Sequence, residues 1–66
     1  MLKNLVAEMA RRQVTRRDIA RTLGISYGTV IVKIKGSYDF TVSEAQKIRD
    51  AYFPDLTIEY LFAKEA

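Results

Sequence analysis

The sequence contains no cysteine and no histidine. Without cysteine, neither a disulfide nor a thiolate metal site can form, which suits a reducing compartment. Without histidine, the usual general base and the commonest nitrogen ligand of metals are missing, and no carboxylates or serines cluster at a spacing that suits catalysis. We therefore expect no enzyme activity, no metal, no cofactor and no small-molecule ligand.

Long hydrophobic runs are also missing. No apolar stretch approaches the roughly 20 residues that a membrane-spanning helix needs, and the N-terminal segment lacks the apolar centre of a signal peptide. These features predict a cytoplasmic protein with no membrane partner. With 66 residues, 48% of them hydrophobic, the chain is expected to fold as one small domain over residues 1–66, which a partner subunit would help to stabilise.

Charge is distributed unevenly along the chain. Residues 1–36 carry eight Lys and Arg against two acidic residues, a net charge of +6, whereas residues 37–66 carry three against six, a net charge of −3. A basic half joined to an acidic half indicates nucleic-acid binding through the basic half. Taken alone, however, the asymmetry is better explained by a solvated charged surface.

Four segments begin with a hydrophobic residue followed by Ser or Thr, which is the sequence signature of a helix start. These pairs are Val14-Thr15, Ile25-Ser26, Phe40-Thr41 and Leu56-Thr57. Two of them also have an acid three residues after the Thr, as a capping box requires, namely Asp18 and Glu44. Together with a helix near the N-terminus, they predict five helices.

Apolar residues at helical spacing extend these starts along the chain. The expected helices cover about 2–12, 16–23, 26–35, 42–52 and a short segment around 58–62. Gly24 ends the second helix as a left-handed cap, and Pro54 stops the fourth by restricting the backbone of Phe53. The sequence thus predicts an all-α fold.

Residues 26–35 fit a helix least well. Val30, Val32 and Ile34 alternate with their neighbours as in a β-strand, and the alternating run 56–62 could pair with them at the edge of an α+β fold. The cap at Ser26 and the helices on both sides favour a helix. That helix would contain Gly28, which destabilises a helix interior by about 1 kcal/mol relative to Ala. It would also place Val32 on its outer face. Such local conflicts are expected most often at functional sites.

A helix that ends in glycine, a three-residue turn and a second short helix form a helix-turn-helix arrangement, whose second helix enters the DNA major groove. Here the sequence resembles the phage repressor and Cro-type helix-turn-helix family. The matching segments are Thr15-x-x-Asp-Ile-Ala20-x-x-Leu-Gly-Ile-Ser26, Thr29-Val30, Lys33-Ile-Lys-Gly36, Asp39-Phe-Thr-Val-Ser-Glu-Ala45, Ile48 and Phe53-Pro-Asp-Leu-Thr-Ile-Glu-Tyr-Leu-Phe62. They cover nearly the whole chain, and the last is similar to the tail of small regulators from phages of Gram-positive bacteria.

The resemblance implies a five-helix, lambda-repressor-like DNA-binding domain with a helix-turn-helix formed by its second and third helices. It also implies a sequence-specific transcriptional regulator, a Cro-like phage or prophage repressor in a bacterial host cell, that reads double-stranded DNA with residues 26–35. Members of the family bind operators with two inverted half-sites about one helical turn, ~34 Å, apart. We therefore expect a homodimer, weakly associated without DNA.

Three groups of residues are expected to make these contacts. Bases would be read by Ser26, Tyr27, Gly28, Thr29, Ile31 and Val32. The DNA backbone would be bound by Thr15, Arg16, Arg17, Lys33, Lys35, Ser37 and Tyr38. The dimer interface would contain Pro54, Leu56, Tyr60 and Phe62, around which apolar surface is expected to remain uncovered.

The expected base-reading helix departs from the family pattern. Tyr27 and Gly28 stand where the family often has Gln, Arg or Ser, so bidentate hydrogen bonds to bases are not expected. Instead, Ile31 and Val32 would contact thymine methyl groups, and Gly28 would let the backbone approach a base pair. Each has a simpler interpretation: Ile31 and Val32 as ordinary exposed apolar residues, and Tyr27 as a packing residue. Arg16 replaces a frequent Gln and can bind phosphate with its charge.

A helical protein-interaction module or an antitoxin is the alternative function. Either would use the same exposed face of residues 26–35 to bind a protein partner. A partner affinity that is insensitive to salt would favour this alternative, because phosphate contacts make DNA binding strongly salt dependent.

Overall fold

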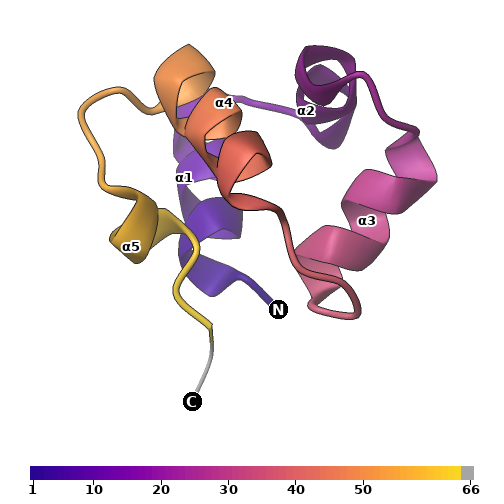
Figure 1. The fold of residues 1–66 in the computed structure, drawn as a ribbon. Coiled ribbons are helices and arrows are strands. Elements are labelled where there is room, and N and C mark those ends of the chain that lie inside the picture. The colour runs from indigo at the N-terminus through magenta and orange to yellow at the C-terminus, as the bar shows by residue number, and fades with distance from the viewer. Residues whose placement is uncertain (65–66) are drawn as a thin grey trace.

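The computed structural model describes residues 1–64, which form five helices and no strand. The helices are α1 (Lys3–Arg12), α2 (Arg16–Leu23), α3 (Tyr27–Lys35), α4 (Val42–Tyr52) and α5 (Ile58–Leu61), arranged as in Figure 1. The predicted all-α fold is therefore confirmed. Both segments whose alternation suggests strands contain a helix, so the alternative of a paired edge is wrong.

The helices surround a single core. Figure 1 shows α3 at one side of the molecule and α5 at the other, with α4 between them, and the domain measures 26 × 25 × 22 Å. α2 contacts both α3 and α4, whereas α5 contacts α1 and α4. Within residues 1–64, no helix combines the length and apolar character needed to cross a membrane.

Each predicted capping hydroxyl accepts a hydrogen bond from an amide in the first turn of its helix. The four residues are Thr15, Ser26, Thr41 and Thr57. Both capping boxes are complete: Asp18, for example, accepts a bond from the Thr15 amide at 2.9 Å, while its own amide donates to the Thr15 hydroxyl at 3.1 Å. These local bonds explain why the helix boundaries agree with the sequence to within one residue.

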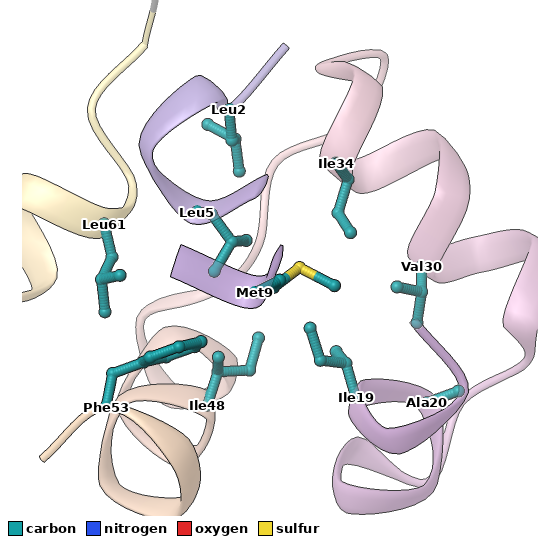
Figure 2. Packing of buried hydrophobic residues seen from close by; sticks show 10 residues of the cluster. All are labelled: Leu2, Leu5, Met9, Ile19, Ala20, Val30, Ile34, Ile48, Phe53 and Leu61. Carbon is teal, nitrogen blue, oxygen red and sulfur yellow. The ribbon is translucent and has the colours of Figure 1, made fainter. Parts of the chain in front are cut away.

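The core contains apolar side chains from all five helices, which converge in Figure 2. The largest fully buried residues are Leu5, Ile19, Val30, Ile34, Ile48, Phe53 and Leu61. The contribution of α3 is Val30 and Ile34, which lie one turn apart on the same face of the helix. Because that face is buried, the opposite face of α3 points away from the core.

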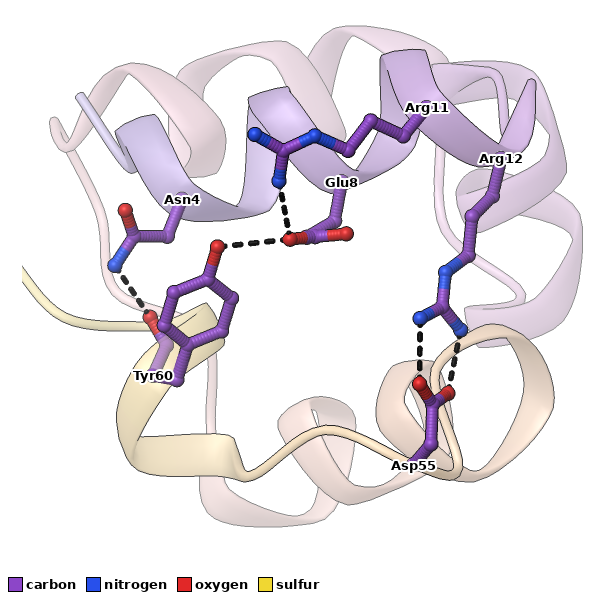
Figure 3. A network of polar contacts seen from close by, with 6 residues as sticks. All are labelled: Asn4, Glu8, Arg11, Arg12, Asp55 and Tyr60. Carbon is purple, nitrogen blue, oxygen red and sulfur yellow. Dashed lines mark hydrogen bonds and ion pairs between the residues drawn. The ribbon is translucent and has the colours of Figure 1, made fainter.

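Polar contacts fasten the C-terminal segment to α1, as Figure 3 shows. The Asn4 side-chain amide donates to the Tyr60 carbonyl at 2.8 Å, and the Tyr60 hydroxyl donates to the Glu8 carboxylate at 2.8 Å. Arg12 donates two hydrogen bonds to the Asp55 carboxylate, at 2.6 and 2.7 Å. We call these five residues the α1–α5 clasp. They close the chain by joining its first helix to its last.

Candidate nucleic-acid interface

The joint between α2 and α3 is short and defined by hydrogen bonds. Gly24 has a left-handed φ of 70°, and its amide donates to the Ala20 carbonyl at 2.8 Å. The amide of Ile25 donates to the same carbonyl at 3.1 Å. Ala20 is only 9% exposed and belongs to the same core cluster as Val30 of α3. The joint therefore holds α3 in a fixed orientation on α2, and Ala20 and Gly24 are packing and turn residues.

The six residues expected to read bases lie along α3 and its cap, with different exposures. Ser26, Tyr27 and Gly28 are exposed, and Thr29, Ile31 and Val32 are half-buried. At about 100° per residue, Gly28 and Val32 lie opposite the buried face of α3. Val32 is nevertheless less exposed than the sequence suggests. The hydroxyls of Ser26 and Thr29 are bonded to each other at 2.8 Å.

Gly28 has no structural role that requires a glycine. It is the second residue of α3 rather than an interior one, so its cost to the helix is smaller than the sequence suggests. A Cβ atom at this position would meet no atom within 4 Å. The backbone of the first turn of α3 is therefore open to close approach by another molecule.

Two arginines lie at the start of α2, next to the start of α3. The Arg17 guanidinium lies over the Tyr27 ring, 4.9 Å from its centre, which links the first turns of the two helices. Thr15, Arg16, Arg17 and Tyr27 line a hollow of about 390 Å³. Neither arginine has an acidic partner among residues 1–64. Cationic side chains beside the amides of a helix N-terminus attract anionic groups.

A second group of expected backbone-binding residues follows the C-terminal end of α3. Lys35, Ser37 and Tyr38 are exposed, Tyr38 by 67%. Gly36, with φ of 98°, turns the chain between them. Lys35 likewise has no acidic partner within residues 1–64. Cationic groups therefore flank α3 at both ends, and residues 19–38 contain no acidic side chain at all.

Lys33 does not belong to this surface, in contrast to the expectation from the sequence. Its ammonium lies 2.6 Å from the Glu44 carboxylate of α4, and the two side chains are only 14% and 19% exposed. It also lies over the Phe40 ring, 5.7 Å from the centre. The hydrogen bond from Lys33, with a second from the Thr41 amide, holds the pKa of Glu44 below its usual value. Lys33 thus ties α3 to α4 and is not available to phosphates.

The residues expected at a dimer interface are divided between the chain's own packing and its exposed surface. Leu56 and Phe62 are half-buried against the core, and the Phe62 ring lies 5.5 Å from that of Phe40. Tyr60 is 38% exposed but its hydroxyl is bonded within the α1–α5 clasp. Pro54 is exposed. Leu56 and Phe62 are thus partly covered by the chain itself, Pro54 and Tyr60 stay exposed, and a dimer interface at this group stays a prediction.

The most exposed large apolar side chain is one that sequence reasoning missed, Val42, which is 74% exposed. It is the first residue of α4, directly after the capping residue Thr41. Helix periodicity offers no signal there, because the first turn of a helix can face either solvent or core. Only the packing of α4 on its neighbours shows that this valine is left uncovered.

Comparisons with protein-family profiles, curated protein sequences and solved structures found no significant match. Within residues 1–64, no group of three His, Cys, Asp or Glu side chains is placed to hold a metal ion. Every buried side-chain nitrogen or oxygen atom in that range has a hydrogen-bond partner.

Proposed function

We propose that this protein is a sequence-specific regulator that binds double-stranded DNA with α3 in the major groove. The observation that carries the proposal is the surface around α3. Arg16, Arg17 and Lys35, which have no acidic partner within residues 1–64, flank an outer face of α3 that has no acidic side chain. The joint at Gly24 supports it, because a helix-turn-helix unit places its second helix on the first in this order.

Phosphate binding is assigned to the groups at the two ends of α3. Arg16 and Arg17 at one end, and Lys35 and Tyr38 at the other, would contact the DNA backbone on either side of the groove. Ser37 joins the second group through its hydroxyl, and Thr15 lines the hollow that holds the first. Such contacts position a protein on DNA without reading its sequence.

Base reading is assigned to the face that contains Gly28 and Val32. Val32, with Ile31 beside it, offers apolar contact to thymine methyl groups, which need no hydrogen bond. The open space at Gly28 permits the backbone to approach a base pair closely. Tyr27 and the paired hydroxyls of Ser26 and Thr29 complete the surface. The mode of reading is therefore one of shape and apolar contact.

A single helix of nine residues contacts few base pairs, so the proposal includes a two-fold dimer on inverted half-sites about one helical turn, ~34 Å, apart. The resemblance to phage repressor and Cro-type regulators gives the same arrangement. Association without DNA would be weak, because a small interface leaves little free energy after rigid-body entropy is lost.

Selection from a random duplex library, followed by footprinting, tests the proposal. We expect one inverted repeat to be enriched and bound by two chains, with affinity falling steeply as salt increases. Enrichment of no sequence, binding of one chain per site, or an affinity independent of salt would contradict it. The last result would favour a protein-binding module.

Substitutions then separate the two kinds of contact. Lys35→Met should weaken binding to specific and random DNA alike. It should also reduce the slope of log affinity against log salt concentration by about one unit. Lys33→Met combined with Glu44→Gln is the matched control, because it removes the paired lysine without leaving an unmatched charge and should leave the slope unchanged. Val32→Ala should weaken specific binding by about 1–3 kcal/mol while leaving the affinity for random DNA unchanged. Equal slopes for the two lysine variants would place the phosphate contacts elsewhere.

A further inference from the structure

An apolar groove begins at the end of α3, away from its first turn, and shares Lys35 with the surface described above. It has a volume of about 430 Å³ and lies between the end of α3, the start of α4 and α5. Its apolar walls include Phe40, Val42, Ala45, Ile58 and Phe62. We call it the α4–α5 groove. Ala45 is buried at its base, whereas Val42 is 74% exposed at its edge, so a large apolar side chain remains available to a partner.

We propose that the α4–α5 groove binds an acidic amphipathic helix of a protein partner. Residues 1–64 contain no strand, so they offer no sheet edge to which an extended segment could add. A groove with apolar walls between helices suits the apolar face of an amphipathic helix, which is a recurring mode of protein recognition. This inference goes beyond DNA binding and does not depend on it.

The charges around the groove select an acidic partner. Three lysines line it, Lys33, Lys35 and Lys64, whereas Asp39 is its only acidic lining residue within residues 1–64. Lys33 is neutralised by Glu44 at 2.6 Å, with both side chains largely covered. Lys35 has no acidic partner in the described part of the chain. An approaching chain therefore meets an excess of positive charge beside the apolar walls.

The pair between Lys64 and Asp39 carries no net charge, but it is weak enough to open. Its atoms lie 2.7 Å apart, but the two side chains are 68% and 66% exposed. Exposed pairs of this kind contribute about 0–1 kcal/mol, so Lys64 can exchange Asp39 for a carboxylate of the partner at little cost. A second copy of this chain fits less well, because a two-fold contact would bring Lys35 and Lys64 of both copies to the same place.

A synthetic peptide tests the proposal directly. The probe is a fluorescein-labelled helix of about five turns, with Leu at i, i+3, i+4 and i+7 and Glu or Asp on its other face. We expect saturable binding by fluorescence anisotropy, and chemical-shift changes at Phe40, Ala45, Ile58 and Phe62 in the labelled protein. A peptide with Lys in place of the acids, and one with the same composition in scrambled order, should each bind at least tenfold more weakly.

Two variants at neighbouring positions of α4 provide the matched comparison. Val42→Glu places a negative charge on the groove wall, whereas Ser43→Glu places the same charge one residue further on, outside the groove lining. Both positions are exposed in the first turn of α4, where an acid favours the helix, so both variants should fold. Val42→Glu should weaken peptide binding at least tenfold and Ser43→Glu less than threefold. Val42→Ser, which adds no charge, should have an intermediate effect.

Several results would overturn the proposal. Equal affinity for the acidic and basic peptides would show that charge does not select the partner. Equal effects of Val42→Glu and Ser43→Glu would show that the peptide does not bind in the α4–α5 groove. Chemical-shift changes confined to the outer face of α3 would place the peptide on the other surface. Concentration-dependent dimerisation of the free protein that Val42→Glu abolishes would show that a second copy occupies the groove.

Discussion

The ammonium of Lys33 and the carboxylate of Glu44 lie 2.6 Å apart, so a largely covered ion pair joins the end of α3 to the start of α4. The same carboxylate accepts a hydrogen bond from the Thr41 amide at 2.9 Å. One acidic side chain therefore completes a helix cap and fixes the neighbouring helix. Loss of the lysine should affect the fold even though the lysine lies on the proposed DNA-binding helix.

We expect Lys33→Met to lower the free energy of unfolding by about 1–3 kcal/mol, since it leaves the Glu44 carboxylate with an unmatched charge while preserving the apolar stem. Urea unfolding measures the change. In a double-mutant cycle with Glu44→Gln, the two effects should be clearly non-additive. Strictly additive effects would mean that the pair contributes nothing to stability.

Acid should weaken the α1–α5 clasp through Asp55. The two hydrogen bonds from Arg12 lower the pKa of Asp55 from 3.8 to about 2. Because the folded pKa is the lower one, the contribution of the carboxylate is complete above pH 3.8 and is lost as the pH falls towards 2. The Asp55→Asn variant should therefore have a lower melting temperature than the parent protein at pH 7. The difference between the two melting temperatures should vanish near pH 2. A difference that stays constant with pH would show that the charge is not involved.

Gly28→Ala should separate the stability of the fold from DNA binding. The added Cβ meets no atom within 4 Å, and alanine is the better helix former, so the free energy of unfolding should rise by up to about 1 kcal/mol. If the backbone approaches a base pair at this position, the same variant should bind its operator more weakly. Thermal melting and anisotropy titrations measure the two effects. A more stable protein with unchanged affinity would exclude close approach at Gly28.

The contact between Arg17 and Tyr27 leads to a test of what the tyrosine does. Tyr27→Phe keeps the ring over which the guanidinium lies, whereas Tyr27→Leu removes it. Because an exposed contact of this kind contributes about 0.5–1 kcal/mol, Tyr27→Leu should lower the affinity for DNA by about twofold to fivefold. Tyr27→Phe should leave it unchanged. If the phenylalanine variant loses as much as the leucine variant, the hydroxyl itself contacts DNA.

Local signals account for most of the fold. The capping pairs, Gly24 and Pro54 act within a few residues of themselves, so their effects can be predicted without knowledge of the tertiary structure. The partner of Lys33 could not be predicted, because it depends on how α3 packs on α4. Leu56 and Phe62 illustrate a related limit: a sequence does not distinguish apolar residues that close the chain's own core from those left for a second subunit.

In the candidate site, too, features set by local sequence differ from features set by tertiary packing. Ser26, Tyr27 and Gly28 are exposed, and Arg16, Arg17 and Lys35 have no acidic partner within residues 1–64, but their roles in DNA binding stay predictions. The half-buried state of Val32 and the exposure of Val42 depend on neighbouring segments, and periodicity alone does not predict either.

The α1–α5 clasp has a consequence for the order in which the molecule assembles. Its hydrogen bonds join residues that are 43 to 56 positions apart in the chain, whereas α2, α3 and α4 follow one another directly. Closing the longer loop costs more chain entropy before any contact forms, so we expect α5 to dock after the middle helices have met. With only four residues, α5 is also the shortest of the five helices within residues 1–64. We therefore expect the last helix to join to be the first to leave, so the amides of Leu61 and Phe62 should exchange with solvent in a partial opening that leaves those of Val30 and Ile34 protected.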